Sequence, residues 1–306
     1  MMWTYIAEQC LNGVQLGATL FLMTAGLTLT FGVMGLVNLA HGSIYMVGAF
    51  VCAYITLRSG SLAAGIASAL ASAAIIGALL ETGVFRRLYA RSHLDQVLAT
   101  FALILIFNGL TKLYFGRQPY QIDVPEFLSG AVHIGESFSY PLYRLVIVLI
   151  GLIVAASLYY IIARTRVGML IRAGSTNRDM VRALGVDLPL LFTLVFALGA
   201  VLAGLAGAII GPVQAVEVGM GDQMVILAFV VIIIGGVGSV RGAMIASLMV
   251  GITDTVGRTV IPQMLKSVTD ITTASALGAA ISSTSVYLLM IVVLLFRPTG
   301  ILSGRI

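Results

Sequence analysis

A chain of 306 residues in which 59% are hydrophobic and only 9% are charged is not an ordinary soluble domain, because such domains carry about 25% charged residues. The formal net charge of +5 does not indicate nucleic-acid binding, since the basic residues lie on short segments between apolar runs. We therefore expect a single all-α transmembrane domain over residues 1–306, surrounded by membrane lipids and without a nucleic-acid partner.

Apolar runs recur from one end of the chain to the other, and a membrane-spanning helix needs about 20 mainly apolar residues. The runs predict a polytopic helix bundle of eight or nine spans with broken helices, because several of them are short or rich in glycine. No lysine, arginine or cleavage pattern precedes the first run, so we expect a retained helix rather than a signal peptide. The nine candidate spans are residues 10–34, 42–57, 62–84, 96–115, 142–163, 190–210, 223–238, 242–257 and 275–296.

The distribution of lysine and arginine predicts which loops face the cytoplasm. Six of these residues fall on one set of loops, and eleven fall on the other set, in residues 85–95, 164–189, 239–241 and 297–306. An excess of basic residues marks the cytoplasmic loops of membrane proteins. We therefore expect an N-terminus outside the cell and a C-terminus in the cytoplasm.

Glycine and polar residues interrupt the apolar sequence at residues 31–43, where Asn38, His41, Gly42 and Ser43 follow the first span. Polar groups cannot face lipid unpaired, and irregular backbone at membrane depth is found only inside protein or beside water. One interpretation is a broken helix or re-entrant turn near a translocation path, as in transporters with discontinuous helices. The alternative is an ordinary cytoplasmic turn between two helices, and the sequence favours neither.

A second glycine-rich break lies at residues 235–242 and contains Gly235, Gly236 and Gly238. Like the first break, it follows an apolar run and leads into a helix that starts with a polar residue and a glycine. This echo suggests an internal duplication, and we expect the second break near the same path.

Two pairs of glycines, Gly13 with Gly17 and Gly207 with Gly211, have the spacing G-x-x-x-G. This spacing places both glycines on one helix face and lets a neighbouring helix approach closely. We interpret both pairs as sites of helix packing.

The segment 164–189 is predicted to form a short amphipathic helix at the cytoplasmic membrane surface. Apolar and basic residues recur in it at helical spacing, at Met169, Arg172, Ala173, Val181 and Leu184. Gly185 then stands where a helix would end. Such a helix could dock in the groove of a partner protein or be held by lipid headgroups, and composition leaves both possibilities open.

The sequence offers no site for chemistry on a bound substrate. It lacks the G-x-x-x-x-G-K-[ST] phosphate loop, and its three histidines are far apart without ligand spacing. We expect no catalytic residue, metal or cofactor, so any ATP hydrolysis must occur on another chain. Glu81 and Asp254 lie near span ends, where we expect them to reach water, and the lack of acids in mid-span disfavours a proton-coupled carrier.

Four stretches of the sequence together resemble a known family. In chain order they are GLTLTFGVMGLVNLAHGSIYMVGAF, TRVGMLIRAGSTNRDMVRALGV, GGVGSVRGAMIASLMVGI and LLFRPTGIL. They are similar to the LivH-type permease family, the membrane subunit of branched-chain amino-acid ABC importers, which also includes urea, amide and aromatic-acid importers. The resemblance covers about residues 9–302.

The resemblance implies a bacterial inner-membrane permease that forms half of a translocation path for branched-chain amino acids or a related small polar solute. It implies four partners: a second related permease subunit, two cytoplasmic ABC ATPase subunits and a periplasmic solute-binding protein. The path element of the family falls here on Asn38, Ala40, His41 and Gly42. The ATPase-coupling element of the family falls on Arg172, Ala173, Asn177, Arg178, Arg182, Leu184 and Gly185.

Two other classes of function remain as alternatives. The first is a self-sufficient channel or an ion-coupled secondary carrier for a small solute, and the second is a membrane scaffold without transport. Residues 258–285 are unusually rich in serine, threonine and alanine. Because this region departs from the family pattern, we do not carry over leucine, isoleucine or valine as the substrate.

Overall fold

The computed structural model describes residues 2–134, 138–266 and 270–302, and long helices dominate it. Eight helical spans among these residues are long and apolar enough to cross a membrane. One of them, α3 (Leu62–Leu80), continues through a π-helical turn at Glu81–Phe85 into α4 (Arg86–Leu88). The other seven are α1 (Met2–Met34), α2 (His41–Ser59), α5 (His93–Phe115), α6 (Leu142–Arg164), α9 (Leu188–Ile210), α11 (Val240–Leu265) and α12 (Ile271–Phe296).

The apolar helix α10 (Met220–Gly235) has only 16 residues. It corresponds to the predicted span at residues 223–238 but is shorter than the roughly 20 residues that a full crossing needs. The bundle predicted from the sequence is confirmed, with eight full-length spans and one short helix in the described part of the chain.

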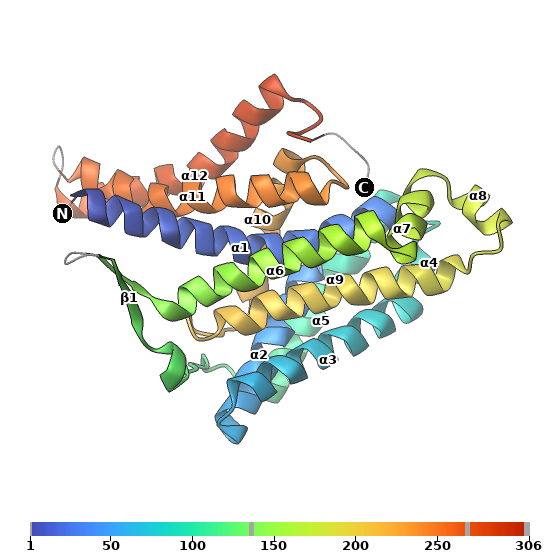
Figure 1. Ribbon diagram of the computed structural model, residues 1–306, viewed down its shortest axis with the longest axis horizontal. Helices are drawn as coiled ribbons and strands as arrows, with labels where there is room; N and C mark the ends of the chain where they lie inside the picture. Colours follow the sequence, from blue (N-terminus) through green and yellow to red (C-terminus); the bar gives the residue numbers. More distant parts are fainter. Residues whose placement is uncertain (1, 135–137, 267–269, 303–306) are drawn as a thin grey trace.

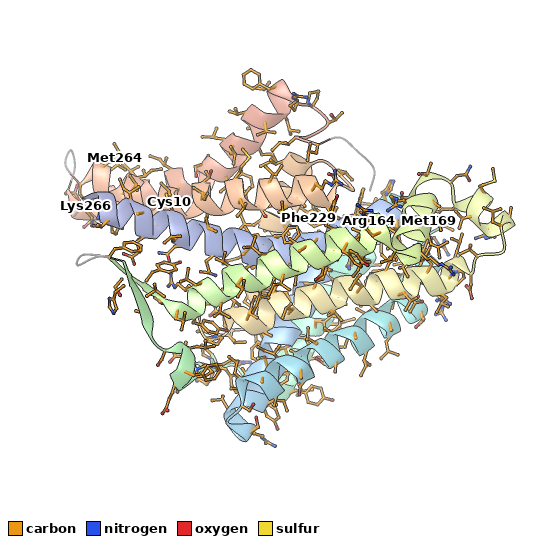
Figure 2. The ribbon with its side chains drawn as sticks, in the orientation of Figure 1. Cys10, Arg164, Met169, Phe229, Met264 and Lys266 are labelled. Carbon is orange, nitrogen blue, oxygen red and sulfur yellow. The ribbon has the colours of Figure 1, made fainter. Side chains whose placement is uncertain are left out.

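The arginine-rich segments gather at one end of the bundle. Figure 1 shows α4, α7 (Arg166–Thr176), α8 (Arg178–Ala183) and the C-terminus toward one end, and the N-terminus toward the other. In Figure 2, Arg164 and Met169 lie at the first end, whereas Met264 and Lys266 lie at the opposite end. The segments that carry most of the basic residues therefore share one end of the bundle, and which side of the membrane this end faces stays a prediction. Residues 303–306, with Arg305, lie outside the described residues.

Helix α1 forms the core of the bundle. An 18-residue apolar stretch of α1 is 83% buried, whereas the corresponding stretches of α5 and α12 are only 11% buried. The pair Gly13 and Gly17 packs against α11: a Cβ atom at Gly13 would lie 2.6 Å from the Cα atom of Ile252. The predicted packing role of this pair is therefore confirmed.

We expect Gly13→Ala to lower the stability of the chain, although alanine is the better helix former. The added methyl group has no room between the backbones of α1 and α11, and overpacking typically costs about 1–3 kcal/mol. The matched control is Gly109→Ala, because a Cβ atom there meets no atom within 4 Å. Thermal unfolding of the purified chain in detergent measures the difference. Equal melting temperatures for the two variants would contradict the packing described here.

The loop between α5 and α6 contains structure that was not predicted. Strands β1 (Ala131–Ile134) and β2 (Phe138–Pro141) pair as an antiparallel hairpin. Earlier in the loop, a 3-10 turn forms at Glu126–Leu128, and Tyr120 makes an isolated bridge with Val216. The two strands have only four residues each, which is too short for an alternating pattern to stand out in the sequence.

Candidate functional site

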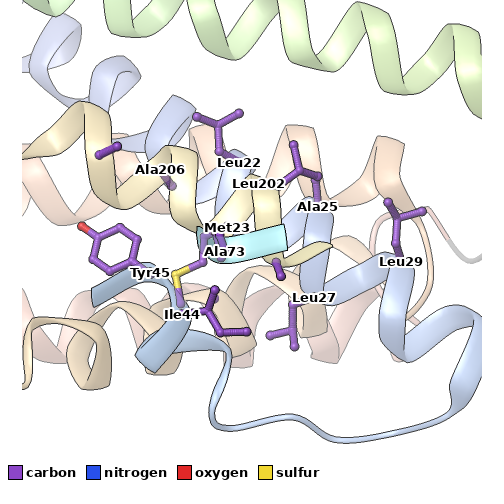
Figure 3. Close-up of a cluster of buried hydrophobic side chains, with 14 of the residues drawn as sticks. Leu22, Met23, Ala25, Leu27, Leu29, Ile44, Tyr45, Ala73, Leu202 and Ala206 are labelled. Carbon is purple, nitrogen blue, oxygen red and sulfur yellow. The ribbon is translucent and has the colours of Figure 1, made fainter. Parts of the chain in front are cut away.

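The connection between α1 and α2 runs back into the bundle. Helix α1 ends at Met34, and the next residues are not helical until His41 begins α2. The Nε2 atom of His41 lies 3.1 Å from the carbonyl oxygen of Met23. Met23 precedes the end of α1 by 11 residues, or about 16 Å along the axis. Figure 3 shows the extended chain returning along α1 toward Ile44. The chain therefore re-enters the bundle, as the broken-helix interpretation expected, and does not make an ordinary turn; a translocation path beside it stays a prediction.

Helix α10 also begins inside the bundle, beside the start of α2. Gly42 in the first turn of α2 and Gly221 in the first turn of α10 touch backbone to backbone, so that a Cβ atom on either would overlap the carbonyl oxygen of the other. Gly219 has a φ of 92°, which lets the chain turn directly into α10. Two helix N-termini therefore meet inside the bundle, and each carries a partial positive charge.

Polar side chains line this break. Asn38, His41 and Ser43 are buried, and the amide atoms of Asn38, the Nδ1 atom of His41 and the hydroxyl of Ser43 have no hydrogen-bond partner among the described residues. A buried polar atom without a partner costs about 1–3 kcal/mol. Packing alone would favour apolar side chains at these positions, so we regard Asn38, His41, Gly42 and Ser43 as the break residues of a candidate path.

The second glycine-rich segment has a different structure. Gly235 ends α10, and residues 236–239 make a tight turn into α11 at the arginine-rich end of the bundle. The backbone N–H groups of Ile301 and Leu302 donate to the carbonyl oxygens of Ile234 and Gly235 at 2.8 and 3.2 Å. The predicted internal duplication is therefore not matched by the structure: one break re-enters the membrane, and the other is a turn closed by the C-terminal segment.

The two breaks still approach each other at one point. A Cβ atom on Gly238 would lie 3.5 Å from the Cα atom of Gly32, near the end of α1. Gly238 is thus placed beside the last turns of α1, whereas Gly235 packs against Gly242 at the start of α11 and Gly236 packs against the C-terminal segment.

The segment 164–189 forms two helices rather than the single helix predicted. Helix α7 ends before Asn177, whose side chain accepts a hydrogen bond from the Met180 backbone N–H at 3.0 Å and caps α8. Gly185 has a φ of 81°, and the N–H of Val186 reaches the carbonyl oxygen of Val181. This arrangement confirms Gly185 as the residue that ends the helix.

The predicted coupling residues divide between two surfaces. Arg182 and Leu184 are exposed, as is Met180, and the exposed fractions of Met180 and Leu184 are 60% and 75%. Arg172 turns inward instead and donates to the backbone carbonyl of Ile162 on α6, and Ala173 is half-buried. The outer face of α8 is therefore both apolar and basic, and no described residue of the chain covers it.

Arg178 connects α8 to the end of α1. Its Nη2 atom donates to the carbonyl oxygen of Val33 at 2.9 Å, one of the last carbonyls of α1, which lack helical partners. Its guanidinium lies 5.6 Å from the ring centroid of Phe192 on α9, and the Tyr89 ring packs edge-on against Phe192 at 5.5 Å. The Tyr89 hydroxyl in turn lies 3.3 Å from the sulfur of Met34. These contacts fix the end of α1 immediately before the chain re-enters the membrane.

Glu81 and Asp254 were predicted to reach water, and this prediction is wrong. Glu81 is fully buried in the π-helical turn, forms an ion pair with Arg86 at 2.9 Å and accepts a hydrogen bond from the Thr193 hydroxyl at 2.5 Å. Asp254 is 5% exposed and pairs with Arg258 at 2.9 Å. An arginine within one or two helical turns neutralises each carboxylate.

One polar pair near the break was not singled out from the sequence. The side-chain amide of Asn108 on α5 donates to a carboxylate oxygen of Asp222 on α10 at 3.4 Å. The Asn108 carbonyl oxygen is buried and has no described partner. An asparagine within the apolar run of α5 was the available signal, because a polar residue in a span is costly unless it faces protein or water.

Comparison with known proteins places this architecture in context. Residues 9–298 match the family described as branched-chain amino acid transport system / permease component. The chain is 30% identical to the high-affinity branched-chain amino acid transport system permease protein BraD of Pseudomonas aeruginosa, over 97% of this chain and 95% of that protein. It is 28% identical to the corresponding LivH protein of Escherichia coli K12, over 98% and 96%. It is also 26% identical to the ribose import permease protein RbsC of the same organism, over 82% and 75%.

Proposed function

Because this chain belongs to the family of permease components of branched-chain amino acid transport systems, we propose that it forms half of the path of an ATP-driven importer. A second related permease supplies the other half, and two cytoplasmic ABC ATPases bind below. A periplasmic solute-binding protein delivers the solute. The chain itself performs no chemistry, and ATP is hydrolysed on the partner subunits.

The observation that carries this proposal is the position of α8. Its outer face exposes Met180, Arg182 and Leu184, which suits docking into the groove of a partner protein. Its inner side holds the end of α1 through Arg178 and Val33. A partner that moves α8 therefore also moves the start of the re-entrant chain. The other predicted coupling residues maintain the shape of the segment 164–189 in this proposal: Arg172, Ala173, Asn177 and Gly185.

The residues that follow α1 transmit movement of its end directly to the proposed path. The chain runs from Val33 through Asn38 to His41 and Gly42, where the N-termini of α2 and α10 meet. Gly238 lies beside the same end of α1, and we assign to the turn with Gly235, Gly236 and Gly238 the role of letting α10 and α11 tilt with it. Solute then moves inward by alternating access, as the break opens first to one side and then to the other.

We propose a branched-chain amino acid or a related small polar solute as the cargo. Helix N-termini favour a carboxylate, and two of them meet at Gly42 and Gly221. Asp222, the residue after Gly221 on α10, carries the negative charge that would pair with the ammonium group of an amino acid. We also propose that the chain lies in a bacterial inner membrane with α7, α8 and the C-terminus in the cytoplasm and the N-terminus outside; the distribution of arginine supports this orientation.

The test is uptake of labelled solute into liposomes that contain the chain with its four partners. We expect uptake only when ATP is inside with the ATPases and the binding protein is outside. Omission of any single partner should abolish uptake. Uptake at an unchanged rate by the chain alone, without nucleotide, would replace this proposal with a self-sufficient channel or ion-coupled carrier.

A further inference from the structure

The bundle has a cleft to which α2 and α3 contribute no lining residue. It has a volume of about 1110 Å³ and lies between α6, the start of α11 and the C-terminal segment. Apolar residues line most of its wall, among them Phe21, Leu152, Ala156 and Met244. None of the break residues Asn38, His41, Gly42 and Ser43 lines the cleft, so it is separate from the meeting point of α2 and α10.

The cleft extends along α1 and α6. Phe21 lies 13 residues before the end of α1, and Leu152 lies 12 residues before the end of α6. At 1.5 Å per residue the apolar wall reaches about 18–20 Å into the bundle from its arginine-rich end. This depth is more than half of the roughly 30 Å hydrocarbon layer of a bilayer. The shape suits an extended hydrocarbon chain.

The mouth of the cleft is strongly basic. Arg172, Arg241 and Arg297 line it, and no acidic residue does. None of the three forms an ion pair within residues 2–134, 138–266 and 270–302. The guanidinium of Arg241 lies 5.0 Å from the ring centroid of Tyr159, which holds it in place. Residues at the N-terminus of α11 also line the mouth and add the positive end of a helix dipole.

We propose that this cleft binds an anionic phospholipid. Its phosphate lies among Arg172, Arg241 and Arg297, and an acyl chain follows the wall formed by Leu152, Ala156 and Phe21. Basic pockets between transmembrane helices at the cytoplasmic surface bind anionic headgroups. The mouth lies at the end that we assign to the cytoplasm, where anionic lipids are found. A bound lipid also contacts Arg172 on α7, and so supports the segment that carries α8.

The test is native mass spectrometry of the full chain, delipidated in a nonionic detergent and then titrated with phosphatidylglycerol or phosphatidylcholine of the same acyl composition. We expect the chain to prefer phosphatidylglycerol. In the double variant Arg241→Ala/Arg297→Ala, binding of this lipid should weaken by roughly 25-fold, from a factor of about 5 for each of the two arginines near an anionic surface. The matched control, Arg87→Ala/Arg91→Ala, removes the same charge from exposed residues at the same end of the bundle.

A second variant tests the acyl site without changing charge. Ala156→Trp fills the wall of the cleft and should also prevent retention of phosphatidylglycerol, while thermal unfolding confirms that the chain still folds. Equal binding by the arginine double variant and its control would overturn the proposal. Competition by millimolar inorganic phosphate would show a free-anion site instead of a lipid site. Absence of the lipid from the complete assembled transporter would show that a neighbouring subunit fills the cleft, and the proposal would be wrong.

Discussion

Arg178→Ala is expected to lower solute uptake by the assembled transporter at least tenfold while ATP hydrolysis continues. The substitution removes the hydrogen bond from α8 to the Val33 carbonyl and the contact with the Phe192 ring. The outer face of α8, which we propose binds the ATPase, stays intact because Met180 and Leu184 are unchanged. ATP-driven movement of α8 then no longer reaches the end of α1. Parallel measurement of uptake and phosphate release in proteoliposomes gives the ratio of solute moved to ATP hydrolysed.

We expect this ratio to fall at least tenfold in Arg178→Ala, since one charge-assisted hydrogen bond contributes about 1.5–3 kcal/mol. The control is Arg91→Ala, an exposed arginine at the same end of the bundle that lies outside α7 and α8. A normal ratio in Arg178→Ala would show that force reaches the break by another route. Loss of hydrolysis together with uptake would show that Arg178 serves ATPase binding instead.

Gly42→Ala is expected to eliminate transport and to destabilise the chain. A Cβ atom at Gly42 would overlap the carbonyl oxygen of Gly221, and the obstacle is backbone rather than a side chain that can move. The N-termini of α2 and α10 must then separate, which disrupts the meeting point that we assign to the solute. Overpacking of this kind typically costs about 1–3 kcal/mol. Uptake by the assembled transporter and thermal unfolding of the chain measure the two effects.

The matched control is Gly83→Ala, because a Cβ atom there meets no atom within 4 Å. Alanine in a helix is intrinsically more stable than glycine by about 1 kcal/mol, so this control should be neutral or slightly stabilising. The two substitutions make the same chemical change, but Gly42→Ala should lower the melting temperature, whereas Gly83→Ala should leave it unchanged or raise it slightly. Full activity and an unchanged melting temperature in Gly42→Ala would contradict the close contact of α2 and α10.

Features set by local sequence were predicted correctly. The spans follow from runs of apolar residues, and the pair Gly13 and Gly17 follows from its spacing. Gly185 was predicted to end a helix because a left-handed residue is favoured there, and its φ is 81°. Each of these features depends on residues within a few positions of one another, which is the distance over which a single sequence is informative.

Features that depend on distant residues were not predicted. The path of residues 35–40 is set by contacts such as His41 with Met23, and nothing near the break specifies the depth to which it returns. Burial of Glu81 depends on Thr193, which lies 112 positions away. The echo between the two glycine-rich breaks was misleading, because the C-terminal segment closes the second one. The two glycine-rich segments resemble each other in sequence, but they contact different distant residues and therefore have different structures.

In the proposed importer, the segment 164–189 faces the cytoplasm and is bound there by an ATPase. Labelling of Leu184→Cys with a membrane-impermeant maleimide, in a chain whose Cys10 and Cys52 are replaced by alanine, tests both points. We predict that the cysteine reacts in inside-out vesicles that contain the permeases alone, and that bound ATPases protect it. Reaction in right-side-out vesicles, or equal reaction with and without the ATPases, would contradict the claim.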